Sequence, residues 1–165
     1  LFSSQIGTLG VVFVSIMIMF IFLFRSFYLA VIGMIPNLLA ASVVLGTMGW
    51  MKVPLDIMTI TVAAISIGMA VDNTIHYIHR FKLEFQKTSN YELSMQNSHR
   101  TIGRAMFYTS STIIIGFLVL LTSNFNPTVY FGLFVSLAMF MALMGALTLL
   151  PQLLIILKPL GRERS

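Results

Sequence analysis

Long apolar runs separated by short polar segments dominate the sequence. About 20 residues of apolar α-helix cross the roughly 30 Å hydrocarbon core of a bilayer, so runs of this length predict transmembrane helices. We therefore predict an all-α membrane protein in which residues 1–165 form a single transmembrane domain. The five predicted spans cover about residues 6–24, 27–49, 57–78, 105–122 and 128–157, with a polar cytoplasmic connector at 79–104.

Three short segments indicate helix boundaries or bends. Arg25-Ser26 forms a two-residue hinge between the first two runs, and Leu150-Pro151 is expected to bend or end the regular part of the last. Inside the connector, Asn90-Tyr91-Glu92-Leu93 is typical of a helix start. Leu93, Met95 and Ile102 then indicate a segment on the membrane surface, although a plain solvated connector fits the same residues.

Composition and charge agree with a membrane protein. Hydrophobic residues make up 58% of the chain and charged residues 9%, against about 25% charged residues in an ordinary soluble domain. Lys52 falls on one side of the predicted threading, and the other basic residues fall on the opposite side, which the positive-inside rule places in the cytoplasm. The amino end is then outside, and the net charge of +5 indicates orientation and lipid headgroups rather than nucleic acid. Because the first residue is Leu1, we expect the chain to be cut from a longer one.

Asp72 is the only acid inside an apolar run. An ionised carboxylate within a span costs about 2.5–3.5 kcal/mol even on the mildest insertion scale, so it is expected to face the bundle interior or a wet cavity. Its position eight residues before Arg80 places it roughly 12 Å in from the cytoplasmic side. Such a carboxyl group could gain and lose a proton during a work cycle, or it could make a structural hydrogen bond across helices.

Residues near Asp72 in sequence or in predicted depth extend this hypothesis. Ala64, Gly68 and His76 share a helical face with it, and small residues allow another helix to approach closely. On the fourth run, Thr109-Ser110-Ser111-Thr112 lies at a similar depth, so its hydroxyls could donate to the carboxylate or only to carbonyls of their own helix.

Other polar residues have more than one interpretation. Pro36-Asn37 in the second run is a possible hinge, with packing between helices as the alternative for Asn37. His79 and His99 are expected to be interfacial or solvated. Asp72, His76 and His79 have a spacing suitable for metal ligands, but no second cluster completes a site, so we predict no metal, no cofactor and no enzymatic activity.

Several short motifs follow one another along the chain: Phe24-Arg25-Ser26, Ile35-Pro36-Asn37, Leu55-Asp56, Gly68-Met69-Ala70-Val71-Asp72-Asn73-Thr74-Ile75-His76, Gly103-Arg104-Ala105, Thr109-Ser110, Gly116-Phe117, Phe131-Gly132 and Leu150-Pro151. Taken in this order, they resemble the resistance-nodulation-division (RND) superfamily of exporters, and specifically its MMPL-like branch, which is related to sterol-sensing-domain proteins.

The resemblance implies a protein of twelve spans in two similar halves, of which this chain would be the last five. It also implies an inner-membrane exporter that uses the proton-motive force to move a lipid or another amphiphile. Asp72 would carry the proton beside Asn73 and His76, and Thr109, Ser110 and Thr112 would support it. The implied partners are the amino-terminal half, membrane lipids, the hydrophobic substrate, further copies of the protein and accessory periplasmic proteins. The alternative is a sterol-sensing-like domain that binds lipid without net transport.

Overall fold

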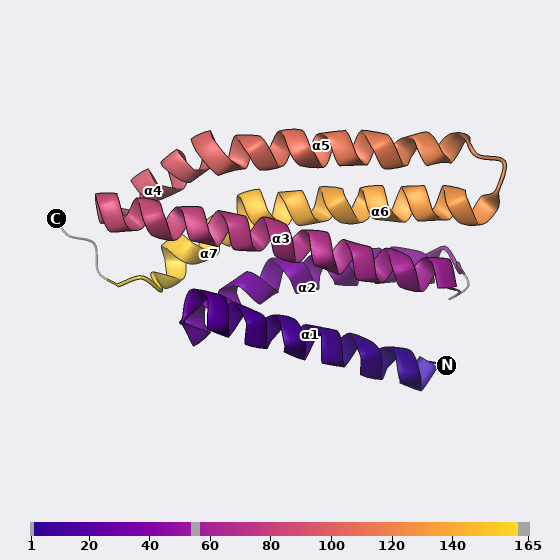
Figure 1. Cartoon of the computed structure of the whole chain (residues 1–165), viewed down its shortest axis with the longest axis horizontal. Helices are drawn as coiled ribbons and strands as arrows, with labels where there is room; N and C mark the ends of the chain where they lie inside the picture. The colour runs from indigo at the N-terminus through magenta and orange to yellow at the C-terminus, as the bar shows by residue number, and fades with distance from the viewer. Residues whose placement is uncertain (1, 54–56, 162–165) are drawn as a thin grey trace.

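The computed structural model describes residues 2–53 and 57–161, and within these ranges the chain folds into α-helices packed side by side (Figure 1). The α-helices are α1 (Phe2–Phe24), α2 (Phe27–Trp50), α3 (Ile57–Thr88), α4 (Tyr91–Ser98), α5 (Arg104–Leu118), α6 (Asn126–Met144) and α7 (Leu150–Leu157). Two π-helical turns, η1 (His99–Gly103) and η3 (Gly145–Leu149), join α4 to α5 and α6 to α7, and the 3₁₀ turn η2 (Val119–Thr122) extends α5. The all-α prediction is confirmed.

The helix boundaries follow local backbone chemistry. Arg25 adopts a left-handed conformation with φ 51°, and the hydroxyl of Ser26 then caps α2 by accepting from the Leu29 amide at 3.4 Å. Asn90 caps α4 in the same way, because its Oδ1 accepts from the Leu93 amide at 3.0 Å. The predicted helix start at Asn90 is therefore confirmed. The other predicted break also appears, since the regular part of α6 ends at Met144 and a π turn precedes Pro151.

The order in which the helices pack differs from their order in sequence. In Figure 1, α6 lies between α5 and α3, and α2 packs against α1, α3 and α6. Two glycines allow the closest approaches. A Cβ on Gly132 would lie 2.5 Å from the Phe117 carbonyl oxygen, and one on Gly145 would lie 3.0 Å from the Cβ of Pro36.

Length and hydropathy identify membrane-spanning helices in the described part of the chain. Phe27–Trp50, Tyr91–Thr122 and Asn126–Leu157 are long and apolar enough to cross a bilayer, and Gly10–Phe24 is a shorter apolar helix. The 32-residue α3 has the length but is more polar than these helices. The chain is therefore an all-α membrane protein, while the count of five spans and their orientation stay predictions.

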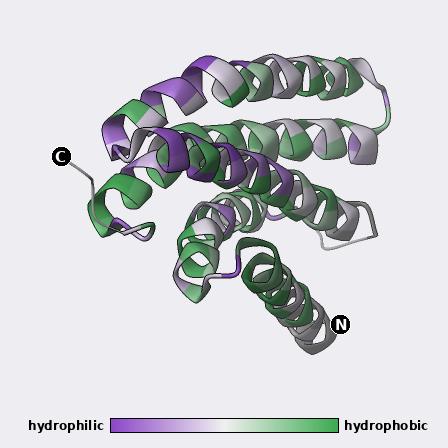
Figure 2. Cartoon of the chain, turned by 60° about the vertical axis from the view of Figure 1, so that its left-hand side comes forward, coloured by the Kyte–Doolittle hydropathy of each residue, from purple (hydrophilic) through white to green (hydrophobic). Residues whose placement is uncertain are grey.

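Polarity is concentrated at one end of the bundle. Figure 2 shows hydrophilic residues around α4 and the carboxyl-terminal part of α3, and mainly hydrophobic residues along α1, α2 and α6. The same end carries the junction between α1 and α2 and the end of α7 (Figure 1). Leu55 and Asp56, which belong to the motifs above, lie outside the described residues.

Candidate functional site

Asp72 and His76 form a pair in the middle of α3. His76 Nε2 lies 3.3 Å from Asp72 Oδ1, at the i, i+4 spacing that places two side chains one above the other on a helix. Both side chains are exposed, Asp72 over 69% of its side-chain surface and His76 over 58%. The pair is therefore accessible to a partner or to water from outside this bundle.

This position corrects one of the two expectations for Asp72, that it faces the interior of the bundle, while the other, that it faces a wet cavity, stays a prediction. The buried face of α3 instead carries Asn73, Thr74 and Tyr77, of which Thr74 contacts α2. Successive side chains of an α-helix point in different directions around its axis, so Asp72, one residue before the buried Asn73, lies on the outer face. An interior position for Asp72 would require α3 to rotate and would expose the apolar residues that now pack against α2 and α6.

A whole stripe of α3 is uncovered by the rest of the described chain. Ala64, Gly68, Asp72 and His76 are all exposed, and a Cβ added to Gly68 would meet nothing within 4 Å. The predicted common face of these four residues is thus confirmed. No helix in the described ranges uses the close approach that the two small residues allow, so their predicted packing role stays untested.

The hydroxyl cluster on α5 does not reach Asp72. Thr109 and Thr112 are exposed, and the Thr112 hydroxyl donates to the Tyr108 carbonyl oxygen at 2.9 Å, which is the local alternative. Ser110 is buried, and no partner for its hydroxyl lies within the described residues. The physical reason is the order of packing, because α6 lies between α3 and α5.

Asn37 makes the polar contact between α2 and the buried face of α3. Its Nδ2 donates to the Gly33 carbonyl oxygen at 2.8 Å, and its Oδ1 lies 3.3 Å from the Thr74 hydroxyl. The Thr74 hydroxyl is also 3.0 Å from the Ala70 carbonyl oxygen, so a single proton can serve either acceptor. The helix α2 continues through Pro36 to Trp50, and the possible hinge there stays a prediction.

His99 is a functional candidate that the sequence pattern missed. It is half-buried rather than solvated and bridges three elements, while the alternative expectation of an interfacial position stays a prediction. Its Nε2 lies 2.9 Å from the Leu147 carbonyl oxygen, and its Nδ1 lies 3.0 Å from both the Tyr77 hydroxyl and the Met95 carbonyl oxygen. A carbonyl oxygen can only accept, so the contact with Leu147 is a hydrogen bond when Nε2 carries the proton. In that neutral tautomer Nδ1 accepts from the Tyr77 hydroxyl and makes no hydrogen bond to the Met95 carbonyl oxygen.

Pro151 explains why Leu147 needs this donor. In an α-helical register the Leu147 carbonyl would accept from the amide of residue 151, and proline has no N–H. The π turn η3 and the His99 ring compensate together for this local defect. The signal readable in sequence was Pro151, but the residue that satisfies the free carbonyl of Leu147 is His99, 48 positions before Leu147.

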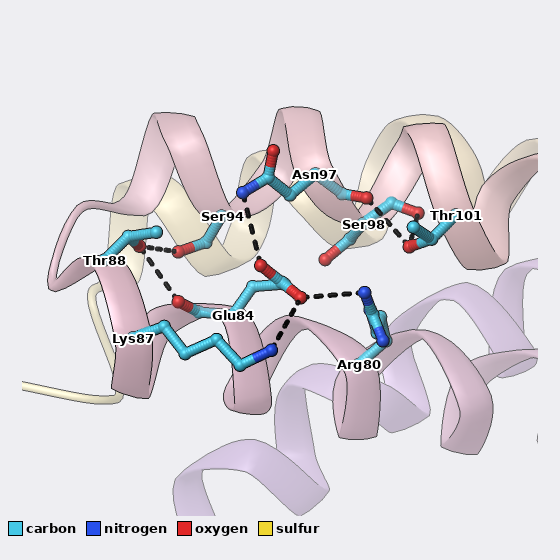
Figure 3. A network of polar contacts seen from close by, with 8 residues as sticks. All are labelled: Arg80, Glu84, Lys87, Thr88, Ser94, Asn97, Ser98 and Thr101. Atoms are coloured by element: carbon cyan, nitrogen blue, oxygen red, sulfur yellow. Dashed lines mark hydrogen bonds and ion pairs between the residues drawn. The ribbon is translucent and has the colours of Figure 1, made fainter.

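A buried carboxylate at the polar end of the bundle holds α4 against α3 (Figure 3). Glu84 accepts from Arg80 Nη2 at 2.8 Å and from Asn97 Nδ2 at 3.2 Å, and Lys87 Nζ lies 3.6 Å away. Only 7% of the Glu84 side chain is exposed. Since Arg80 and Lys87 lie on α3 and Asn97 lies near the end of α4, this network holds α4 to α3 two residues before His99.

The His, Asp and Glu side chains of the described residues do not gather into a metal-binding cluster. Within the residues that the structure describes, no three His, Cys, Asp or Glu side chains gather as a metal site would require. Asp72 and His76 lie together, whereas His99 lies with Tyr77, Met95 and Leu147.

Comparisons with known proteins agree with the family suggested by the motifs. The model of the MMPL family matches residues 2–164. A curated protein of Methanocaldococcus jannaschii, described as a "putative membrane protein", is 29% identical over 155 residues. That match covers 94% of this chain and 39% of the relative, so the chain spans about two fifths of the relative's length. No solved structure matches. Because the family match covers nearly the whole chain, from the first helix to the polar carboxyl end, the chain belongs to the MMPL family.

Proposed function

We propose that the chain is part of an RND/MMPL-type transporter that uses the proton-motive force to export a lipid or another hydrophobic or amphiphilic molecule across the inner membrane. Membership of the MMPL family supports a membrane transporter or a related domain. The observation that carries the finer proposal is the Asp72–His76 pair, exposed in the middle of an otherwise largely apolar stretch of α3.

The environment of Asp72 favours a functional role over a structural one. Its only described partner is His76 on the same helix, so the carboxylate does not tie two helices of this bundle together. Left against lipid, an ionised Asp would cost about 2.5–3.5 kcal/mol, so another polypeptide or water is needed to cover it. In our proposal the rest of a longer family protein covers Asp72. This chain aligns with 39% of the length of its relative, so further segments are available for that role.

Proton transfer needs a group that exists in two protonation states and a route to water. Asp72 and His76 are both titratable, and their 3.3 Å separation allows a proton to pass between them. The stripe of Ala64 and Gly68 beside them leaves room for a second helix to approach and to shift as Asp72 changes charge. The pair is then the coupling element, and transport rather than catalysis is the proposed activity.

The decisive variant is Asp72→Asn, made in the protein expressed from its complete gene. We expect normal expression, because the side chain is exposed and holds no other helix. We also expect loss of gradient-driven proton uptake into proteoliposomes of phosphatidylethanolamine and phosphatidylglycerol that contain a pH-sensitive dye. Glu92→Gln is the matched control, since Glu92 is an exposed acid on α4 outside the predicted spans.

Two results would contradict the proposal. Proton uptake by Asp72→Asn at the rate of the parent protein would remove the proposed carrier. Retention of lipid by the parent protein without any proton movement under an imposed pH gradient would favour the second candidate, a sterol-sensing-like domain. That candidate is supported by the open face of α3, which could also receive a lipid or a regulatory partner.

A further inference from the structure

A groove opens at the polar end of the bundle, between the α4–η1 segment and the η3–α7 segment. Its volume is about 560 Å³, within the roughly 300–1,000 Å³ typical of ligand sites. The lining residues are Met95, Gln96, His99, Arg100, Leu147, Thr148, Pro151 and Gln152. None of them belongs to the stripe that carries Asp72, so the groove is a separate feature of the molecule.

Both walls of the groove depart from regular α-helix. One wall includes the π turn η1 and the other includes the π turn η3, and π turns occur frequently at functional sites. The hydrogen bond from His99 Nε2 to the Leu147 carbonyl oxygen ties the walls together. The shape of the groove is therefore held by the same hydrogen bond that compensates for the missing N–H of Pro151.

The lining is apolar in one part and polar in the other. Met95, Leu147 and Pro151 give the apolar part. Arg100 brings a positive charge, and Gln96, Thr148 and Gln152 are exposed polar neighbours. This lining is complementary to a ligand in which an apolar portion lies next to a negatively charged portion that accepts hydrogen bonds.

The charge of Arg100 is not neutralised within the described part of the chain. No ion pair is formed by Arg100 there, and the acids that do form ion pairs in those ranges are Asp72 and Glu84, which lie beside other basic residues. An arginine guanidinium presents a planar set of donors that matches phosphate. The groove therefore offers an anion-binding group for which the described residues supply no competing acid.

We propose that this groove binds the headgroup of an anionic phospholipid from the cytoplasmic leaflet, with Arg100 on the phosphate and an acyl chain along Met95, Leu147 and Pro151. The basic residues gather on this side of the predicted threading, which is the side that faces anionic lipids. Leu93, which lies near the groove in sequence, is a further exposed apolar side chain on α4, with 45% of its surface accessible. This lipid site goes beyond the transport proposal, because it does not depend on Asp72 or on proton movement.

The test is a titration of the protein, expressed from its complete gene and held in detergent, with dihexanoyl phosphatidylglycerol. Native mass spectrometry gives the bound lipid and hence the dissociation constant. We expect Arg100→Gln to weaken binding about tenfold, as the loss of a charge-assisted hydrogen bond predicts. Thr148→Trp, which fills the groove and keeps the charge, is expected to weaken it as well.

The matched control is Arg25→Gln, because Arg25 is an exposed arginine at the same end of the bundle, between α1 and α2. Its affinity for phosphatidylglycerol should equal that of the parent protein, and dihexanoyl phosphatidylcholine should bind less tightly. Unchanged binding in Arg100→Gln would overturn the proposal. An equal loss in Arg25→Gln would also overturn it, because general surface charge would then account for binding. Displacement of the lipid by inorganic phosphate at the same concentration would identify a free-anion site instead.

Discussion

Replacing His99 with Phe should reveal how much the hydrogen bonds of the imidazole contribute to stability. The ring of Phe is somewhat larger than imidazole but is also planar and aromatic, and it can keep the edge contact with Tyr77, whose centroid lies 5.6 Å from that of His99. What is lost is the donor to the Leu147 carbonyl and the acceptor for the Tyr77 hydroxyl. Leaving a buried polar group without a partner costs about 1–3 kcal/mol, so two such groups predict a loss of at least about 2 kcal/mol.

Thermal unfolding followed by circular dichroism in dodecyl maltoside micelles measures this loss. For a chain of 150–250 residues, about 2 kcal/mol corresponds to a fall in Tm of about 4–8 °C. The matched control is His79→Phe, because His79 is an exposed histidine on α3, and its Tm should change little.

A second substitution tests the assigned cause. Pro151→Ala restores an amide that can donate to the Leu147 carbonyl, so His99→Phe should cost less in that background. Equal Tm values for His99→Phe and His79→Phe would refute the bridging role of His99. A cost of His99→Phe that is unchanged by Pro151→Ala would refute the link to the proline.

Two further substitutions test packing and the polar end of the bundle. Gly132→Ala should destabilise the chain by about 1–3 kcal/mol, because its Cβ would lie 2.5 Å from the Phe117 carbonyl oxygen. Gly116→Ala, which meets nothing within 4 Å, should leave the Tm of the chain unchanged or raised, and equal effects of the two would contradict this account. Glu84→Gln should loosen α4 from α3 at a cost of about 1–3 kcal/mol, seen as faster amide hydrogen exchange in α4. The exposed Glu92 provides the control as Glu92→Gln, and α4 exchange equal to that of the parent in Glu84→Gln would contradict the assigned role.

The two faces of α3 have different roles in this architecture. The face with Asn73, Thr74 and Tyr77 holds the bundle together, and the face with Asp72 and His76 stays open. A change of protonation at Asp72 can therefore alter contacts with an outside partner without breaking the core. This separation is the structural basis on which a proton-coupled role is proposed.

The sequence by itself determined the helices and most of their ends. Apolar runs of bilayer length predict helices from local hydropathy alone, and the caps at Ser26 and Asn90 act over three residues. The common face of Ala64, Gly68, Asp72 and His76 also follows from helical periodicity. Likewise, the bend near Pro151 follows from the missing N–H of proline.

Only the tertiary structure decided which of these faces is covered and which residues meet. The order of packing places α6 between α3 and α5, so Thr109 and Thr112 do not reach Asp72 although they lie at a similar predicted depth. The bridge from His99 to Leu147 joins residues 48 positions apart. Such contacts depend on how each helix is rotated about its axis and on which helix becomes its neighbour, and hydropathy along a single helix specifies neither of these.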